Sequence, residues 1–299
     1  MFNPLPTPIQ PPAFSPPSGT ALDWDDRTPP VLLIHDGGGT TFSYYCLGDL
    51  GRLVYGIANP RYDSGKAWDG GIPEMAAHYL SMLKSGLFPS PPPSDDIGKR
   101  PIGMEKKKKK VILGGWSLGG MIALEMARQV ATDPEQVLEV VGVVMVDSPC
   151  PFAPSFSTSP QPPPKVVQHV VEWSPMTRED TKRKITRCFS EALRMLGEWT
   201  LPEWADNAAA RGVRPPPPVV LIRATEPVPV VEQPGVARVD VRRGDRTLGW
   251  EGYRKGLVMK VIDVPGHHYN MFQGEEHLDA VTEAIRQACT ELDGMARVY

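Results

Sequence analysis

A serine between glycines stands where an apolar run meets an amphipathic segment, in the stretch GGWSLGGMIALEMA that begins at residue 114. Gly115-Trp116-Ser117-Leu118-Gly119 matches the G-x-S-x-G pattern, in which the serine occupies a tight strand-to-helix turn. Residues two positions to either side must be small there, since larger side chains would clash. The exposed hydroxyl could act as a nucleophile, and the amide of Leu118, at a helix N-terminus, could bind a developing oxyanion. A glycine-rich turn with an inert serine is the alternative.

A second donor for an oxyanion can come from the sequence IHDGGGTTFSYY, which follows the first apolar run of the chain. Glycines let the backbone approach a substrate closely, so the amides of Gly37 and Gly38 are candidates. A phosphate-binding loop is not expected, because neither the G-x-G-x-x-G nor the G-x-x-x-x-G-K-[ST] pattern is present. A merely flexible turn is the alternative.

The candidate base lies in VPGHHYNMF, residues 264–272, where His267 and His268 follow the last apolar run. If that run is a parallel strand, both histidines lie at the carboxyl edge of the sheet, where Ser117 also emerges. Two acids could hold the histidine: Asp147 in VMVDSP and Glu226 in IRATEP, each of which follows a strand-like run. The residues by themselves leave both the histidine and the acid undecided.

Six short apolar runs can supply the strands that position these side chains. They are residues 31–35, 53–58, 111–116, 140–146, 218–224 and 257–264, and they lie between the clusters into which many of the 34 prolines of the chain fall. Helical patterns alternate with them over 72–85, 118–131 and 273–293. Such alternation predicts an α/β fold with a mostly parallel, doubly wound sheet.

One connection is too long for a simple crossover, since 71 residues separate Asp147 from Val219. Within it, Thr177 and Asp180 fit a helical capping box. A single apolar face then follows at helical spacing; it comprises Ile185, Cys188, Phe189, Ala192, Leu193 and Leu196. We expect this helical insertion to cover the sheet as a lid, with packing at the side of the sheet as the alternative.

Composition restricts the class of protein. The 299 residues carry a net charge of -3 with both signs scattered, which gives no reason to expect nucleic acid or an acidic membrane as a partner. No run approaches the length of a membrane span, and the N-terminus does not read as a signal peptide. We therefore expect a cytoplasmic protein. Its four cysteines, Cys46, Cys150, Cys188 and Cys289, are widely spaced and read as free buried thiols, so neither a metal nor a cofactor is expected.

Three further motifs are given ordinary explanations. The lysine-rich tract 105–110 precedes the strand that ends before Ser117, which puts it at the opposite edge of the sheet, so a solvated loop is favoured over a docking site. The sequence RGD at 243–245 reads as a turn. The sequence LGW at 248–250 could line a pocket or pack in the core.

Taken together, these pieces resemble the thioesterase domains that end fungal polyketide synthases and nonribosomal peptide synthetases. The resemblance rests on IHDGGGTTFSYY, GGWSLGGMIALEMA, VMVDSPCP, DRTLGWEGY and VPGHHYNMF, which occur in the family's order. It implies an α/β-hydrolase with a helical lid. Matched to the family's motifs, the catalytic residues would be Ser117, Asp147 and His268, with the amides of Leu118 and Gly37 as oxyanion donors.

The implied function is release of a polyketide or peptide chain from a phosphopantetheinyl carrier protein in secondary metabolism, by hydrolysis or cyclisation through an acyl-serine. A general carboxylesterase or lipase is the alternative, and a catalytically silent fold is a third. The expected organisation is a Pro-rich extension at 1–30, a core at 31–148 and 215–299, and a lid at 149–214. Because the chain starts at Met1, we expect a free-standing, trans-acting enzyme, with an excised terminal domain as the alternative.

Overall fold

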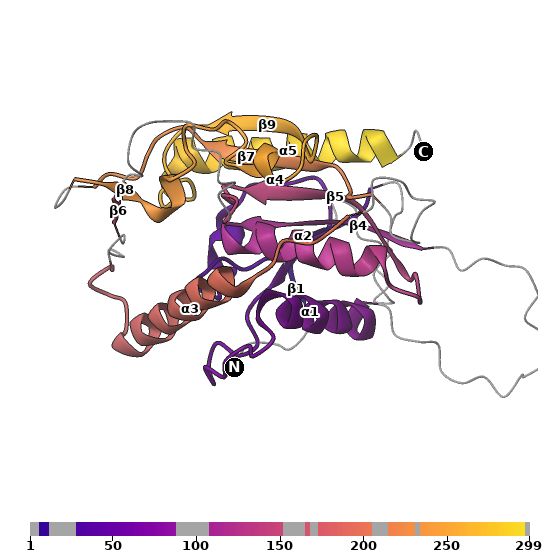
Figure 1. The fold of residues 1–299 in the computed structure, drawn as a ribbon, viewed down its shortest axis with the longest axis horizontal. Helices are drawn as coiled ribbons and strands as arrows, with labels where there is room; N and C mark the ends of the chain where they lie inside the picture. The colour runs from indigo at the N-terminus through magenta and orange to yellow at the C-terminus, as the bar shows by residue number, and fades with distance from the viewer. Residues whose placement is uncertain are drawn as a thin grey trace, which may run out of the picture.

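The centre of the molecule is a seven-stranded sheet (Figure 1). The computed structural model describes residues 6–11, 28–87, 108–151, 165–167, 173–204, 215–230 and 234–296. From one edge to the other, the strands are β1 (Thr7–Gln10), β3 (Val54–Ile57), β2 (Val31–Ile34), β4 (Lys109–Trp116), β5 (Leu138–Val146), β7 (Val219–Ala224) and β9 (Val258–Val264). Neighbouring strands are parallel except β1 and β3. The predicted mostly parallel α/β sheet is confirmed.

Both faces of the sheet are buried, which explains why its strands read as continuous apolar runs. On β2, Leu32 and Ile34 pack into the core on one face, while Val31 and Leu33 pack into the core on the other. The helices α1 (Gly71–Leu87) and α2 (Leu118–Ala131) cover the first face, and α5 (Glu275–Ala296) covers the second. Within the described ranges, no helix combines the length and the apolar character needed to cross a bilayer.

A helix from the long insertion, α3 (Glu179–Glu198), lies at the end of the sheet where the parallel strands finish (Figure 1). The short strands β6 (Val166–Val167) and β8 (Val236–Ala237) pair at the same end. The predicted capping box is wrong: Arg178 is the N-cap residue and makes no side-chain cap bond. The Asp180 carboxylate is instead paired with Lys184, at 2.8 Å, and with Arg183.

The insertion helix is tied to the loop before α1. Arg194 Nη2 donates to the Trp68 carbonyl at 2.7 Å, and the Trp68 amide donates to Glu191 Oε1 at 2.8 Å. Arg187 Nη2 donates to the Tyr62 carbonyl at 2.6 Å. These bonds fix the polar side of α3, which leaves its apolar side free to form a wall.

Three local features differ from or add to the sequence analysis. Residues 7–10 of the Pro-rich N-terminal segment form β1, an edge strand on which Pro8 is tolerated. Cys46 is exposed, at the end of the 3₁₀ helix η1 (Phe42–Cys46), so the expectation that all four thiols are buried is wrong. Trp250 opens the short helix α4 (Trp250–Tyr253) and, like Leu248, is fully buried, which makes the LGW sequence part of the core. The proposed boundaries at 30, 148 and 215 stay predictions.

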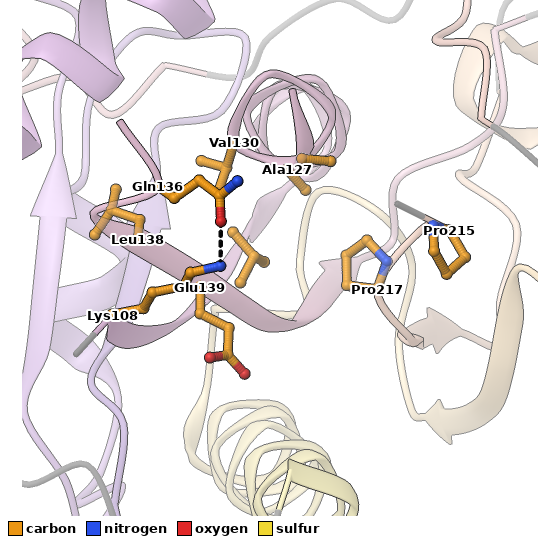
Figure 2. Close-up of a pocket in the computed structure, with 10 residues that line it drawn as sticks. Lys108, Ala127, Val130, Gln136, Leu138, Glu139, Pro215 and Pro217 are labelled. Carbon is orange, nitrogen blue, oxygen red and sulfur yellow. Dashed lines mark hydrogen bonds between the residues drawn. The ribbon is translucent and has the colours of Figure 1, made fainter. Parts of the chain in front are cut away.

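The described lysines of the basic tract lie at the amino ends of β4 and β5, away from Ser117. Figure 2 shows a small cavity there, of about 80 Å³, where Lys108 Nζ donates to Gln136 Oε1 at 2.5 Å. Lys110 Nζ donates to the Ala296 carbonyl at 3.2 Å and lies 3.9 Å from Glu139. Among the described residues, this cavity therefore offers space for little more than a few waters, and Lys108 and Lys110 already have partners.

Candidate active site

Ser117 occupies a strained turn between β4 and α2. Its φ of 56° and ψ of -117° are rare for a residue with a side chain, as a tight strand-to-helix elbow requires. A Cβ on Gly115 would lie 2.6 Å from the Ile34 carbonyl oxygen, and one on Gly119 would lie 2.3 Å from the same atom. The two glycines thus allow the elbow to pack on the end of β2. The Ser117 amide donates to the Val146 carbonyl at 2.9 Å, which joins the elbow to the end of β5.

His268 bridges Ser117 and Asp147. Its Nε2 lies 3.1 Å from Ser117 Oγ, and its Nδ1 lies 2.8 Å from Asp147 Oδ2. The ring is 2% exposed and rests against Trp116, with the ring centroids 5.5 Å apart. Since an ionised Asp147 can only accept, Nδ1 carries the proton and Nε2 faces the serine hydroxyl with a lone pair.

Asp147 is fully buried, with four hydrogen bonds on its carboxylate. Besides His268, it accepts from Arg243 Nη1 at 2.6 Å, from Arg243 Nη2 at 2.8 Å and from the Ala224 amide at 3.0 Å. Burial by itself would raise the pKa of Asp147, but the hydrogen bonds from Arg243 and His268 outweigh it and hold the pKa well below its usual range. The carboxylate therefore stays charged near neutral pH.

Arg243 is a residue whose place the sequence analysis missed. The RGD sequence does form a turn, since the Asp245 amide donates to the Arg242 carbonyl at 2.9 Å. The guanidinium of Arg243, however, points inward, where Nε donates to Asp240 Oδ1 at 2.9 Å and Nη1 to the Ala224 carbonyl at 2.8 Å. The i, i+3 spacing of Asp240 and Arg243 suggests such a pair, but nothing in the sequence indicates its burial beneath Asp147.

The other predicted acid and histidine lie outside this arrangement. Glu226 is exposed, and its amide donates to the Gly266 carbonyl at 2.9 Å. His267 accepts a hydrogen bond on Nδ1 from the Tyr269 amide at 3.2 Å, and its own amide donates to Asn270 Oδ1 at 2.6 Å. These hydrogen bonds make His267 part of the structure of the loop that positions His268.

Some backbone amides of the glycine-rich loop donate hydrogen bonds within the loop, and others remain available to a substrate. The Gly38 amide donates to Asp36 Oδ1 at 3.0 Å and the Gly39 amide to the Asp36 carbonyl at 3.1 Å. Within the described part of the chain, the amides of Gly37 and Leu118 have no such acceptor, and both residues line the same cavity as Ser117. Of the two glycines considered, Gly37 thus keeps a free donor at the candidate oxyanion site.

His35, beside this loop, is held neutral. Its Nδ1 lies 2.6 Å from the Asp36 carbonyl oxygen and its Nε2 lies 2.6 Å from the Tyr79 hydroxyl. Burial lowers the pKa of His35 to about 4, with partial compensation from the bond to Asp36. The side chain therefore supports the loop that carries Gly37.

A cavity of about 400 Å³ opens above Ser117. The apolar side of α3 forms one wall, with Phe189, Leu193 and Leu196. The described residues contain no cluster of His, Cys, Asp and Glu side chains that could hold a metal ion. A cavity of this size and lining suits an organic chain.

The chain is similar to known proteins over most of its length. A model of the alpha/beta hydrolase family matches residues 31–284. Thioesterase AMT4 of Alternaria alternata is 34% identical over 272 residues, covering 88% of this chain and 85% of that protein. The probable thioesterase gloN of Glarea lozoyensis is 32% identical over 282 residues, covering 88% and 90%.

Solved structures give the same fold. The NocB thioesterase domain from the nocardicin cluster has a TM-score of 0.54 at 22% identity, covering 87% of this chain and 93% of that chain. A Vlm2 thioesterase domain bound with a dodecadepsipeptide has a TM-score of 0.56 at 16% identity, covering 95% and 97%. At such identities the likeness shows the fold alone. The chain belongs to the alpha/beta hydrolase family, as an enzyme related to fungal thioesterases.

Proposed function

We propose that the protein is a serine thioesterase that releases an acyl chain, a polyketide or peptide, from the phosphopantetheine arm of a carrier protein. The observation that carries the proposal is the hydrogen-bonded row Ser117–His268–Asp147, at 3.1 and 2.8 Å. The choice of a thioester as the substrate rests on the relatives, which are named thioesterases. We expect the enzyme to act in the cytoplasm, without metal or cofactor.

The first half-reaction forms an acyl-serine. As Ser117 Oγ bonds to the thioester carbonyl carbon, its proton passes to His268 Nε2, and Asp147 stabilises the resulting imidazolium. The carbonyl oxygen becomes an oxyanion that accepts from the amides of Gly37 and Leu118, each worth roughly 3–4 kcal/mol in such sites. The carbon–sulfur bond then breaks, and the thiolate takes the proton from His268.

The second half-reaction frees the product. Water, or a hydroxyl or amine within the acyl chain, gives its proton to His268 as it attacks the acyl-serine carbonyl. The bond to Ser117 Oγ breaks, and His268 returns the proton to the serine. Attack by water gives hydrolysis, and internal attack gives a ring. The apolar wall of α3 supports the proposal because it can hold the chain during this second attack.

The test compares one acyl group presented as a pantetheine thioester and as the matched oxyester. We expect kcat/KM to favour the thioester and the S117A variant to lose turnover. A strong preference for the oxyester would instead favour a general esterase. Turnover retained by S117A would refute the acyl-serine chemistry altogether.

A further inference from the structure

Two arginines, Arg238 and Arg242, line the cavity above Ser117. Arg238 begins the 3₁₀ helix η2 (Arg238–Asp240), and Arg242 lies four residues later; both line the cavity. Arg238 is exposed and Arg242 is half-buried, with its aliphatic stem over Gly249. Among the described residues, neither guanidinium makes a hydrogen bond or an ion pair.

The neighbouring arginines behave differently. Arg243, turned away from the cavity, binds Asp147 and Asp240, and Arg246 lies 3.3 Å from Asp263. The two arginines of this segment that do not line the cavity are thus paired with carboxylates, and the two that line it have no such partner among the residues that the structure describes. An anionic group bound at this end of the cavity would give both guanidinium groups a partner.

We propose that Arg238 and Arg242 bind an anionic oxygen group carried by the thioester substrate. Guanidinium groups suit this task because each presents a planar fork of donors to phosphate or carboxylate oxygens. Two sources share the chemistry: the phosphate of the phosphopantetheine arm and a carboxylate on the acyl chain. The inference rests on the proposed thioesterase function of the same cavity.

The placement of the pair fits a substrate that spans the cavity. Ser117 and His268 lie at the carboxyl ends of the strands, and Leu193 and Leu196 of α3 supply apolar surface to the same cavity. Arg238 lines the same cavity and is exposed, so solvent can reach it. A thioester whose reacting carbonyl lies at Ser117 can therefore place an anionic group at the arginines while its apolar part contacts α3.

The experiment uses three thioesters with one acyl backbone: a neutral acyl-pantetheine, its 4′-phosphate, and an acyl-pantetheine with a terminal carboxylate. The wild-type enzyme, R238Q/R242Q and the control R246Q are compared by kcat/KM. We expect R238Q/R242Q to lose roughly 10- to 100-fold on one anionic substrate, mainly through KM, and under twofold on the neutral one. The substrate that suffers identifies the source of the anion. R246Q should match the wild type.

Labelling of Ser117 by a neutral fluorophosphonate checks that the double variant is folded, and its rate should be unchanged. Equal losses on neutral and anionic thioesters, or no wild-type preference for either anionic substrate, would overturn the inference while leaving the thioesterase proposal in place. Failure of the wild type to turn over any of the three would count against the proposed function itself.

Discussion

Replacing Arg243 with methionine should destabilise the protein strongly, because it leaves two carboxylates buried without their cation. The guanidinium donates twice to Asp147, once to Asp240 and once to the Ala224 carbonyl, all between 2.6 and 2.9 Å. The side chains of Arg243, Asp147 and Asp240 are 9%, 0% and 3% exposed. Methionine approximates the volume of the arginine stem but supplies none of these donors.

The expected loss follows from that burial. Removing one partner of a buried ion pair costs about 3–5 kcal/mol, against roughly 0–1 kcal/mol for an exposed pair. The matched control is R246M, since Arg246 is 66% exposed in its pair with Asp263. We therefore expect R243M to lose about 3–5 kcal/mol and R246M less than about 1 kcal/mol. R243K should fall between them, because an ammonium lacks the fork that engages both oxygens of Asp147.

The pH dependence gives a second readout. Asp147 has a folded-state pKa below its ordinary value, so its contribution to stability is present above about pH 4 and is lost as the pH falls further. In R243M the pKa of Asp147 should be lowered less, because one of its hydrogen-bonding partners is missing. The difference in the free energy of unfolding between wild type and variant should therefore be largest near neutral pH and become smaller below about pH 4.

Urea denaturation from pH 3 to 8 measures both effects. Cooperative unfolding with an unchanged dependence on denaturant must be verified first. An R243M protein within about 1 kcal/mol of wild type at pH 7 would refute the reasoning, since it would mean that Asp147 is held by other groups.

Three further predictions concern individual side chains. H268A should slow acylation roughly a thousandfold or more and H267A less than tenfold, as read by burst release of thiol; equal losses would make both histidines part of the chemistry. D147N should reduce kcat roughly 10³- to 10⁴-fold while E226Q leaves it unchanged, and the reverse would reassign the acid. Burial raises the pKa of Asp36 to about 6. Its contribution to the free energy of unfolding, at most about 3 kcal/mol, is therefore present below about pH 4 and is lost as the pH rises through 6. D36N should abolish this fall in stability with pH, and an unchanged fall would show that another group titrates.

Much of the fold could be predicted because its strands are buried on both faces. The six predicted runs coincide with β2, β3, β4, β5, β7 and β9. The edge strand β1 was missed, because Pro8 and a length of four residues give no strand signal. The capping box failed because Asp180 finds lysine and arginine partners on its own helix.

The candidate site also contains residues that could be predicted from the sequence and residues that could not. The serine elbow was predictable because its glycines are a local steric requirement, now visible as the contact of Gly119 with the end of β2. The residues by themselves left His267 and His268 undecided, since the choice depends on how Asn270 folds the loop, and only the family resemblance selected His268. Arg243 was not predictable either, because burial of one turn residue depends on β5, β7 and the segment after η2 meeting in space.

The central claim, that Ser117 forms an acyl-enzyme with a thioester, can be tested directly by mass spectrometry. The enzyme is mixed with a panel of acyl-pantetheine thioesters, quenched within the burst phase and digested. The account predicts an acyl mass increment on the peptide containing Ser117, absent from S117A and formed far more slowly by H268A. Thioester turnover with an unmodified Ser117, or an acyl group found on another residue, would contradict it.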